Sequence, residues 1–267
     1  MKYFVISDVH SYFTPLRKAL KQAGFNKRNK NHTLVLCGDL FDRGHESVKL
    51  YEWIRSIPKK RRILIRGNHE MLLKNLVERG YFCKHDIFNG TLDTIHQFTE
   101  YSYGDCIQVP GQVLEDFNNL GVLQWIFSKE WVNYWEYKDY IFVHSWIPLV
   151  ALDDLPHHII ENRKFKFNPN WRESTDSEWE DAMWGCPYKL LQQKLYPDGK
   201  VIVCGHWHAR DFHKYIEGKL GVDNSIFFSK NCIALDACTA VSDECNVLVI
   251  DEDGSCYDKY GNSLGSV

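Results

Sequence analysis

The stretch Thr33-Leu34-Val35-Leu36-Cys37-Gly38-Asp39-Leu40-Phe41-Asp42-Arg43-Gly44 decides the fold of this 267-residue chain. Its first five residues are apolar or β-branched, as in a buried strand, and its last seven form a polar cluster bounded by glycines. Strand patterns at 3–6 and 61–65 end in the same way, in Ser7-Asp8-Val9-His10 and Arg66-Gly67-Asn68-His69-Glu70. Because helical patterns at 14–23, 46–56 and 69–78 alternate with these strands, the sequence predicts an α/β sheet with crossover helices.

The polar clusters fall where such a sheet binds its ligands. In α/β sheets, ligands bind outside the carboxyl ends of the strands. Later in the chain, a strand at 140–143 ends in His144, and a strand at 201–204 runs into Gly205-His206-Trp207-His208. We therefore expect carboxylates, imidazoles and an amide to meet at one edge of the fold.

The remaining segments are predicted in coarser terms. We expect residues 81–138 to form a helical, aromatic-rich insertion whose aromatic residues belong to the core, and residues 153–181 to form a variable loop with exposed tryptophans. Strands at 201–204, 225–228, 232–235 and 246–250 are not separated by helical patterns, so we expect them to pair antiparallel. No linker or repeat interrupts the pattern, which predicts a single domain over residues 1–267.

The composition of the chain excludes several classes of function. Its 32 basic and 35 acidic side chains give a formal net charge of -3, so no bulk positive field favours nonspecific nucleic-acid binding. No stretch approaches the ~18 apolar residues of a membrane span, and the N-terminal apolar run is too short for a secretory signal. We therefore expect a cytoplasmic protein without a membrane partner. The nine cysteines contain no C-x-x-C pair, which favours neither a disulfide framework nor a zinc knuckle.

The donor types at the strand ends predict the kind of ion that they would bind. Oxygen and nitrogen donors without thiolate suit manganese, iron, zinc, nickel or cobalt better than a soft metal. Together, the donor side chains at the strand ends are numerous enough to bind two cations. A bridging carboxylate would then be needed to offset the repulsion between the two ions.

Five ordered blocks resemble those of a known family. Asp8-x-His10, Gly38-Asp39-x-x-Asp42-Arg43-Gly44, Gly67-Asn68-His69-Glu70, the strand-terminal His144 and Gly205-His206-x-His208 resemble the calcineurin-like metallophosphoesterase superfamily. The Asp42-Arg43-Gly44 extension and Arg66 further resemble its phosphoprotein phosphatase branch, which includes protein phosphatases and diadenosine tetraphosphate hydrolases. This resemblance implies two facing mixed β-sheets flanked by helices, a four-layer αββα sandwich.

The resemblance also implies the ligands of a dinuclear metal centre. Asp8, His10 and Asp39 would hold the first ion, and Asn68, His144 and His206 the second, with Asp39 as the bridge. His208 has two interpretations. In the wider superfamily the second histidine of this pair binds the first ion, whereas the phosphatase branch usually lacks it, so that His208 would be a loop residue. Manganese is the expected metal, with iron, zinc, nickel or cobalt as alternatives.

Catalytic roles follow from the same resemblance. Two cations roughly 3.5–4 Å apart would lower the pKa of a shared water, which supplies the hydroxide nucleophile, and would stabilise the phosphoryl oxygens. Arg43 and Arg66 would bind the nonbridging oxygens, because a guanidinium makes bidentate and always-charged contacts. His69 would protonate the leaving oxygen, and Asp42 would orient its imidazole. We expect Glu70 to support the start of the helix rather than to react.

The chain departs from the pattern of the branch at three places. The branch usually has glycine before the first aspartate and after the first histidine, where this chain has Ser7 and Ser11. It also usually has a phosphate-binding arginine shortly after a tryptophan in a later loop, whereas Met183-Trp184-Gly185-Cys186-Pro187 contains none. Arg163, Arg172 or Arg210 could replace that arginine.

The leading functional prediction is a metal-dependent phosphoesterase that hydrolyses phosphomonoesters, first of all phosphoserine or phosphothreonine in proteins. The first alternative is a phosphoanhydride hydrolase that acts on dinucleoside polyphosphates or capped RNA ends, with aromatic residues of the middle segment stacking on a base. The second is a non-catalytic metal-binding scaffold. Asp42, Arg43, Arg66 and His69 disfavour the scaffold, because turnover requires them and metal retention does not. The oligomeric state is not indicated.

Overall fold

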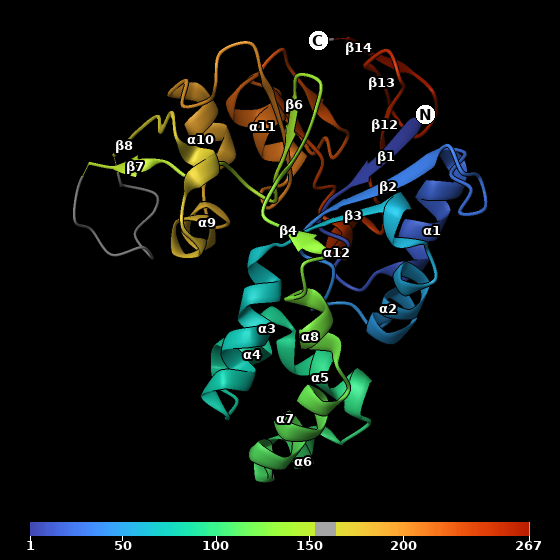
Figure 1. The fold of residues 1–267 in the computed structure, drawn as a ribbon, viewed down its shortest axis with the longest axis vertical. Helices are drawn as coiled ribbons and strands as arrows, with labels where there is room; N and C mark the ends of the chain where they lie inside the picture. The colour runs from blue at the N-terminus through green and yellow to red at the C-terminus, as the bar shows by residue number, and fades with distance from the viewer. Residues whose placement is uncertain (153–163, 267) are drawn as a thin grey trace.

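The three strand patterns of the first third lie side by side as parallel strands (Figure 1). They are β1 (Lys2–Ile6), β2 (His32–Cys37) and β3 (Arg62–Ile65) in a computed structural model that describes residues 1–152 and 164–266. Helix α1 (Phe13–Gln22) connects β1 to β2, and α2 (Ser47–Arg55) with the 3₁₀ turn η1 (Lys59–Arg61) connects β2 to β3. Parallel strands need such crossovers, so the predicted alternation of strands and helices is confirmed here.

The first sheet extends beyond these strands at both sides. Its strand order is β14-β13-β12-β1-β2-β3-β4, with β4 parallel to β3 and β12 antiparallel to β1. The two C-terminal strands were not predicted, because the sequence between 251 and 267 is polar and rich in turn residues. The added strands are β4 (Trp131–Val132), β12 (Leu248–Ile250), β13 (Ser255–Tyr257) and β14 (Ser263–Ser266).

The second sheet corrects the predicted pairing of the late strands. Its order is β10-β11-β9-β6-β5, and β11 pairs with β9 in parallel, not antiparallel. The reason is helix α11 (Ala209–Tyr215), which follows β9 and supplies the crossover that the sequence pattern did not reveal. The pair β10–β11 is antiparallel as expected. The strands are β5 (Trp135–Tyr137), β6 (Tyr140–Phe142), β9 (Val201–Cys204), β10 (Phe227–Phe228) and β11 (Cys232–Ala234).

Three apolar clusters separate four layers. Val5 and Val35 of the first sheet pack with Phe142 and Val203 of the second, so one core lies between the two sheets. The alternate side chains of the first sheet pack against α1 and α2, and those of the second pack against residues such as Phe212 of α11. This arrangement confirms two mixed sheets flanked by helices.

The segment 81–138 is helical only in its first part. Its helices end at Ile126, after which β4 and β5 enter the two sheets, so the prediction of a helical segment to residue 138 is wrong for its last dozen residues. Trp125 and Trp131 are buried, as expected, and pack against each other. Tyr81, Phe88 and Tyr103 are exposed, so the prediction that the aromatic residues of this segment belong to the core is confirmed only in part. With α3 (Asn68–Arg79), the helices gather below the sheets in the view of Figure 1: α4 (Lys84–Asn89), α5 (Thr91–Thr99), α6 (Tyr103–Gln108), α7 (Pro110–Asn119) and α8 (Val122–Ile126).

The variable loop predicted at 153–181 is largely structured where it is described. Residues 153–163 lie outside the described residues. Trp171 and Trp179 are 1% and 3% exposed, so the prediction of exposed tryptophans is wrong; both rings pack against Tyr134. The elements of this region are β7 (Val150–Ala151), β8 (Phe165–Lys166), η3 (Trp171–Glu173), α9 (Asp176–Ala182) and α10 (Pro187–Gln192).

Two further observations complete the fold. A short helix, α12 (Thr239–Ser242), lies between β11 and β12. Among the described residues, no helix has the length and the apolar character needed to cross a bilayer. The assignment of residues 1–267 to a single domain stays a prediction.

Candidate metal centre

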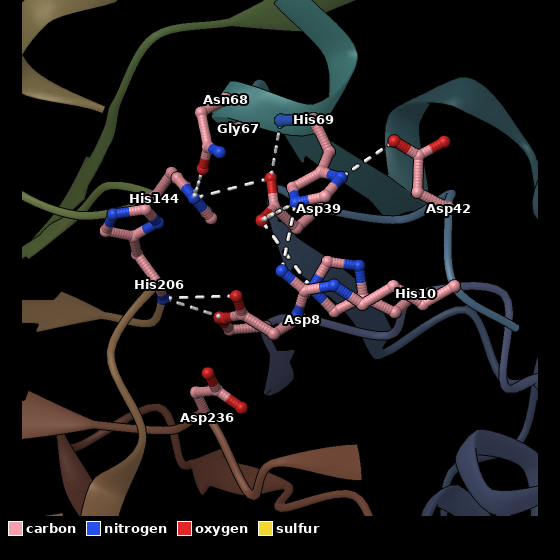
Figure 2. A network of polar contacts seen from close by, with 12 residues as sticks. Asp8, His10, Asp39, Asp42, Gly67, Asn68, His69, His144, His206 and Asp236 are labelled. Atoms are coloured by element: carbon pink, nitrogen blue, oxygen red, sulfur yellow. Dashed lines mark hydrogen bonds and ion pairs between the residues drawn. The ribbon is translucent and has the colours of Figure 1, made fainter. Parts of the chain in front are cut away.

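Polar residues from both sheets meet at one edge of the fold (Figure 2). The structure brings together six of the seven predicted ligands, each from the segment that follows a strand: Asp8 and His10 after β1, Asp39 after β2, Asn68 after β3, His144 after β6 and His206 after β9. All except His206 are at most 3% exposed. The strand-end rule therefore predicted correctly that these side chains would meet, whereas their role as metal ligands stays a prediction.

The backbone of this site is strained. Among the described residues, twelve non-glycine residues have positive φ, and seven of them belong to this site: Asp8, His10, Ser11, Asp39, Asp42, Arg43 and His206. Such conformations cost about 1–3 kcal/mol each and persist where the surroundings hold them. The strain turns several functional side chains toward one point.

Asp39 lies at the centre of the site. Two groups of side chains with metal-ligand spacing share it, namely His10–Asp39–His69 and Asp39–His144–His206, each with ligand atoms within 4.8 Å of one another. Its Oδ2 is 3.7 Å from His10 Nε2, and its Oδ1 is 3.4 Å from His144 Nε2. One carboxylate thus faces two histidine clusters, which is the geometry that a bridging ligand needs.

The histidines are oriented by partners on their far sides. His10 Nδ1 is 3.0 Å from the Phe41 carbonyl oxygen, and His144 Nδ1 is 2.9 Å from the Cys37 carbonyl oxygen. A carbonyl only accepts, so each Nδ1 donates and each Nε2 turns its lone pair inward. Metal-binding histidines are oriented in this way.

Asn68 and His144 give the sharpest test of whether the site fits a cation. The Asn68 amide oxygen lies 2.8 Å from His144 Nε2, although both atoms carry lone pairs in this orientation. Two such atoms at this distance repel each other unless a proton or a cation lies between them. Buried carboxylate, amide and imidazole donors therefore fit a divalent metal.

Burial favours the neutral form of His10 and His206, which is the form that binds metals. Burial, together with the neighbouring His69, lowers the pKa of His10 well below its ordinary value. Burial and His144 lower the pKa of His206 to about 3. For Asp39, burial acts to raise the pKa, but His144 and the other surrounding imidazoles outweigh it, so that the net pKa is lowered.

Asp8 and Asp236 form a second acidic part of the site. The Asp8 carboxylate accepts the His206 backbone N–H at 3.0 Å, and it also accepts the Ser7 hydroxyl. Burial raises the pKa of Asp8 well above its ordinary value, and the charges of Asp236 and Asp39 raise it further. Asp236 is 4% exposed and was not predicted as a site residue, although it too follows a strand.

His208 stands apart from the six clustered residues. Its side chain is 30% exposed, its Nδ1 is 3.6 Å from Asp211, and its Nε2 is 3.9 Å from Asp236. Neither of the histidine groups around Asp39 includes it. The two interpretations of His208 therefore stay open; its nearest carboxylate is that of Asp211, followed by that of Asp236.

His69 and Asp42 form a buried pair at the other side. His69 Nδ1 is 2.7 Å from Asp42 Oδ2, and Asp42 also accepts the hydroxyls of Thr91 at 2.8 Å and Thr94 at 2.7 Å. Burial acts to lower the pKa of His69, but Asp39 and Asp42 outweigh it, and the net pKa is raised. The threonines were missed by sequence reasoning, since nothing local links α5 to a residue about fifty positions earlier.

The two predicted phosphate-binding arginines differ in their surroundings. Arg43 is exposed and faces the cluster, with its guanidinium 3.0 Å from His10 Nε2 and 3.2 Å from His69 Nε2. Arg66 is half-buried at the edge, where it donates to the Asn133 side-chain oxygen at 2.8 Å. Burial lowers the pKa of Arg66.

Glu70 confirms its predicted structural role. Its carboxylate accepts the backbone N–H groups of Asp39, Leu40 and Gly67 at 2.8–2.9 Å, which ties the β2 loop to the start of α3. Burial, followed by the nearby Asp39, raises its pKa to about 7.

Close packing explains two glycines in the motifs. A Cβ on Gly67 would overlap the Asp39 carboxylate, and one on Gly205 would overlap the side chains of Ser7 and Asp8. Only glycine lets these backbone segments approach the carboxylates.

Two of the three candidates for a replacement phosphate clamp, Arg172 and Arg210, belong to the described residues. Arg163 lies outside the described residues. Arg172 forms a bidentate pair with Glu136 at 2.6 and 2.8 Å, and Arg210 is part of α11, near Cys238. Trp184 instead sets its ring edge-on to His206, with centroids 6.0 Å apart.

A family model and several known proteins are similar to this chain. A family model described as calcineurin-like phosphoesterase matches residues 1–210. A symmetrical bis(5'-nucleosyl)-tetraphosphatase from Hamiltonella defensa subsp. Acyrthosiphon pisum is 38% identical over 73 residues, which cover 27% of this chain and 26% of that protein. One from Buchnera aphidicola subsp. Schizaphis graminum is 24% identical over 199 residues, which cover 73% of this chain and 64% of that protein. The chain thus spans less than two thirds of either relative.

Solved structures share the fold at low sequence identity. A cold-active protein tyrosine phosphatase aligns with a TM-score of 0.54 and 14% identity, over 99% of this chain and 78% of that chain. A candidate diadenosine tetraphosphatase aligns with a TM-score of 0.51 and 14% identity, over 96% of this chain and 92% of that chain. At such identities these similarities speak to the fold alone.

Proposed function

This chain belongs to the calcineurin-like phosphoesterase family, and from that premise we propose that it hydrolyses the phosphoanhydride bonds of dinucleoside polyphosphates. The observation that carries the substrate is the similarity to symmetrical bis(5'-nucleosyl)-tetraphosphatases, one of which aligns over 73% of this chain. This was the first alternative from the sequence, and the comparisons support it better than the leading prediction of a phosphoserine or phosphothreonine phosphatase.

In this proposal the clustered donors hold two divalent ions. Asp8, His10 and Asp39 would hold the first and Asn68, His144 and His206 the second, with Asp39 shared. Such a pair of ions, when bound, activates a water and offsets the negative charge of the phosphoryl oxygens. The position of Asp39 between two histidine groups supports this assignment. The identity of the metal is left to experiment, with manganese as the first candidate.

The side chains around the ions have separate tasks. Arg43 binds the phosphoryl group that is attacked, since its guanidinium faces the cluster, and Arg66 binds a phosphate at the edge. Water adds to the phosphorus, and the bond between the phosphorus and the bridging oxygen of the leaving nucleotide breaks. His69, held by Asp42 at 2.7 Å, donates a proton to that oxygen.

The two other functions from the sequence have less support. The protein phosphatase among the structural neighbours is 14% identical and therefore does not indicate a substrate. The scaffold hypothesis does not explain why Asp42, Thr91 and Thr94 hold His69 in one orientation.

A substrate panel tests the proposal. Manganese-loaded protein is assayed for kcat/KM with diadenosine tetraphosphate, a phosphoserine peptide and a capped RNA. We expect diadenosine tetraphosphate to be hydrolysed with the highest kcat/KM, with nucleotide products separated by chromatography. A higher value for the phosphopeptide would overturn the substrate while leaving the family chemistry intact. The Asp139→Asn protein is a control for handling, because Asp139 is 55% exposed and pairs with Lys200.

A further inference from the structure

A cleft adjoins Arg66, one of the proposed phosphate-binding residues, because Asn133, to which Arg66 donates, belongs to its lining. It has a volume of about 460 Å³ and is lined by side chains that include Asn133, Tyr134, Trp135, Glu136, Arg172 and Trp179. This volume falls within the range of about 300–1,000 Å³ that is typical of small-molecule sites. The lining combines aromatic rings with a few polar groups, as such sites do.

Arg66 connects this cleft to the centre. It directly precedes Gly67 and Asn68, and its guanidinium donates to the Asn133 side-chain oxygen at 2.8 Å. A phosphate bound by Arg66 would therefore lie between the ligand cluster and the cleft. Because the Asn133 oxygen is occupied by Arg66, the amide nitrogen of Asn133 is the group that can donate to a ligand in the cleft.

Arg172 gives the cleft a fixed, flat guanidinium surface. Its Nε and Nη2 atoms donate to the two Glu136 oxygens at 2.6 and 2.8 Å. Its guanidinium carbon lies 4.3 Å from the centroid of the Trp171 ring, so one face of the group is stacked. The side chain is nevertheless 43% exposed. A guanidinium held in this way can stack a second planar group, and nucleobases stack on arginine planes in other proteins.

We propose that this cleft binds one nucleoside of the substrate, with the base stacked against Arg172 and the adjoining phosphate on Arg66. The inference rests on the proposed function, because only a nucleotide substrate places a base one phosphate away from Arg66. It also explains why Arg172 does not act as the missing phosphate clamp: Glu136 neutralises it and leaves its flat face, not its edge, for a ligand. The cleft thus favours substrates that carry a base, whereas the catalytic centre alone would not distinguish substrates with a base from those without one.

The test compares a substrate that reaches the cleft with one that does not. For Arg172→Ala and Arg172→Lys, the ratio of kcat/KM for diadenosine tetraphosphate to kcat/KM for p-nitrophenyl phosphate should fall about tenfold or more, the size of one lost base-stacking contact. Arg172→Lys keeps the charge but loses the plane, so it separates stacking from electrostatics. Arg55→Ala is the matched control, since Arg55 also packs on aromatic rings, Tyr51 and Trp125, but belongs to α2; this variant should keep the ratio of the unmodified protein.

A binding measurement keeps the inference separate from the proposed function. Adenosine monophosphate and inorganic phosphate are compared as inhibitors of p-nitrophenyl phosphate hydrolysis. We expect adenosine monophosphate to inhibit about tenfold better, and Arg172→Ala to remove that advantage while inhibition by inorganic phosphate stays. If diadenosine tetraphosphate is not hydrolysed but this preference holds, the proposed function fails and the nucleoside cleft stands. Equal inhibition by the two compounds, or equal losses in Arg172→Ala, overturns the cleft.

Discussion

The two sheets contribute to the site in different ways. The loops after β1, β2 and β3 supply Asp8, His10, Asp39 and Asn68, all buried, and a carbonyl, a backbone N–H or another side chain fixes most of their orientations. The second sheet supplies His144, which is equally buried, and the loop after β9 supplies His206 and His208, which are partly exposed. Trp135 and Glu136 of β5 line the cleft that contains Arg172. We call the buried donor residues and their supporting contacts the rigid half of the site, and the loop after β9 together with the cleft the open half. In the proposed function the rigid half carries the chemistry and the open half meets the substrate.

The largest expected loss of activity is that of Asp39→Asn, which changes the central carboxylate of the rigid half. An amide in place of the shared carboxylate removes the charge that both histidine groups face. We expect kcat/KM for p-nitrophenyl phosphate to fall about 1,000-fold or more, because several kcal/mol of charge stabilisation are lost. Metal content, measured by mass spectrometry, should fall as well. Full activity of chelator-treated, metal-free protein would contradict the two-metal proposal.

His69→Asn should act next most strongly and should depend on the leaving group. A general acid matters most for a poor leaving group such as a serine alkoxide, where we expect a loss on the order of 100-fold to 10,000-fold. Nitrophenolate and a nucleoside diphosphate leave more readily, so their losses should be smaller. The comparison of kcat for the three substrates measures this. The bound metal content serves as the control, and equal losses for all leaving groups would rule out the acid role.

Thr94→Val tests whether the helical insertion, to which Thr94 belongs, supports the rigid half. Its hydroxyl donates to Asp42, so its loss should loosen the Asp42–His69 pair and lower kcat about tenfold, as losses of supporting contacts do in metal sites. Thr94→Ser should restore activity, because it keeps the hydroxyl. Thr99→Val is the matched control on α5, since Thr99 donates only to the Ile95 carbonyl. An increase in KM alone, with kcat unchanged, would contradict the positioning role.

His208→Ala tests what the open half contributes to metal binding and activity. Because His208 is 30% exposed and lies outside both histidine groups, we expect two bound ions per chain to remain and activity to fall less than about tenfold. The measurement is metal stoichiometry after dialysis. Loss of one ion would show that His208 follows the pattern of the wider superfamily.

The sequence predicted the rigid half well, and for a physical reason. Each of its candidate ligands stands directly after an apolar strand, so short-range pattern and strand order together determine where Asp8, Asp39 and Asn68 meet. Asp236 follows the same rule, because it comes just after β11, although it was not among the predicted site residues.

The open half and the supports could not be predicted in this way. Thr94 supports Asp42 from a helix in the insertion, and Arg172 meets Glu136 across 36 positions, so neither contact has a local signal. The parallel pairing of β9 and β11 was missed because a seven-residue helix is too short to give a clear period.

The smallest expected effect concerns Ser11, which stands where the phosphatase branch usually has glycine. Substitutions at this position measure how well the rigid half tolerates that departure. Ser11 has φ 59°, in the left-handed region that glycine adopts without strain, and its buried hydroxyl pairs with that of Ser47 at 2.8 Å. Ser11→Ala keeps the strain and loses the hydrogen bond, whereas Ser11→Gly relieves about 1–2 kcal/mol of strain and loses the same bond. Part of that gain is offset by the greater freedom of glycine in the unfolded chain.

We therefore expect the glycine variant to be more stable than the alanine variant by about 1 kcal/mol, measured as the difference in the free energy of unfolding in urea. Adding Ser47→Ala to Ser11→Gly should recover stability, because it removes the buried hydroxyl that would otherwise lack a partner. An alanine variant as stable as the glycine variant would show that the surrounding loop relaxes at this position. The strained backbone of the loops that carry the candidate ligands would then be less tightly held than the pattern of their contacts indicates.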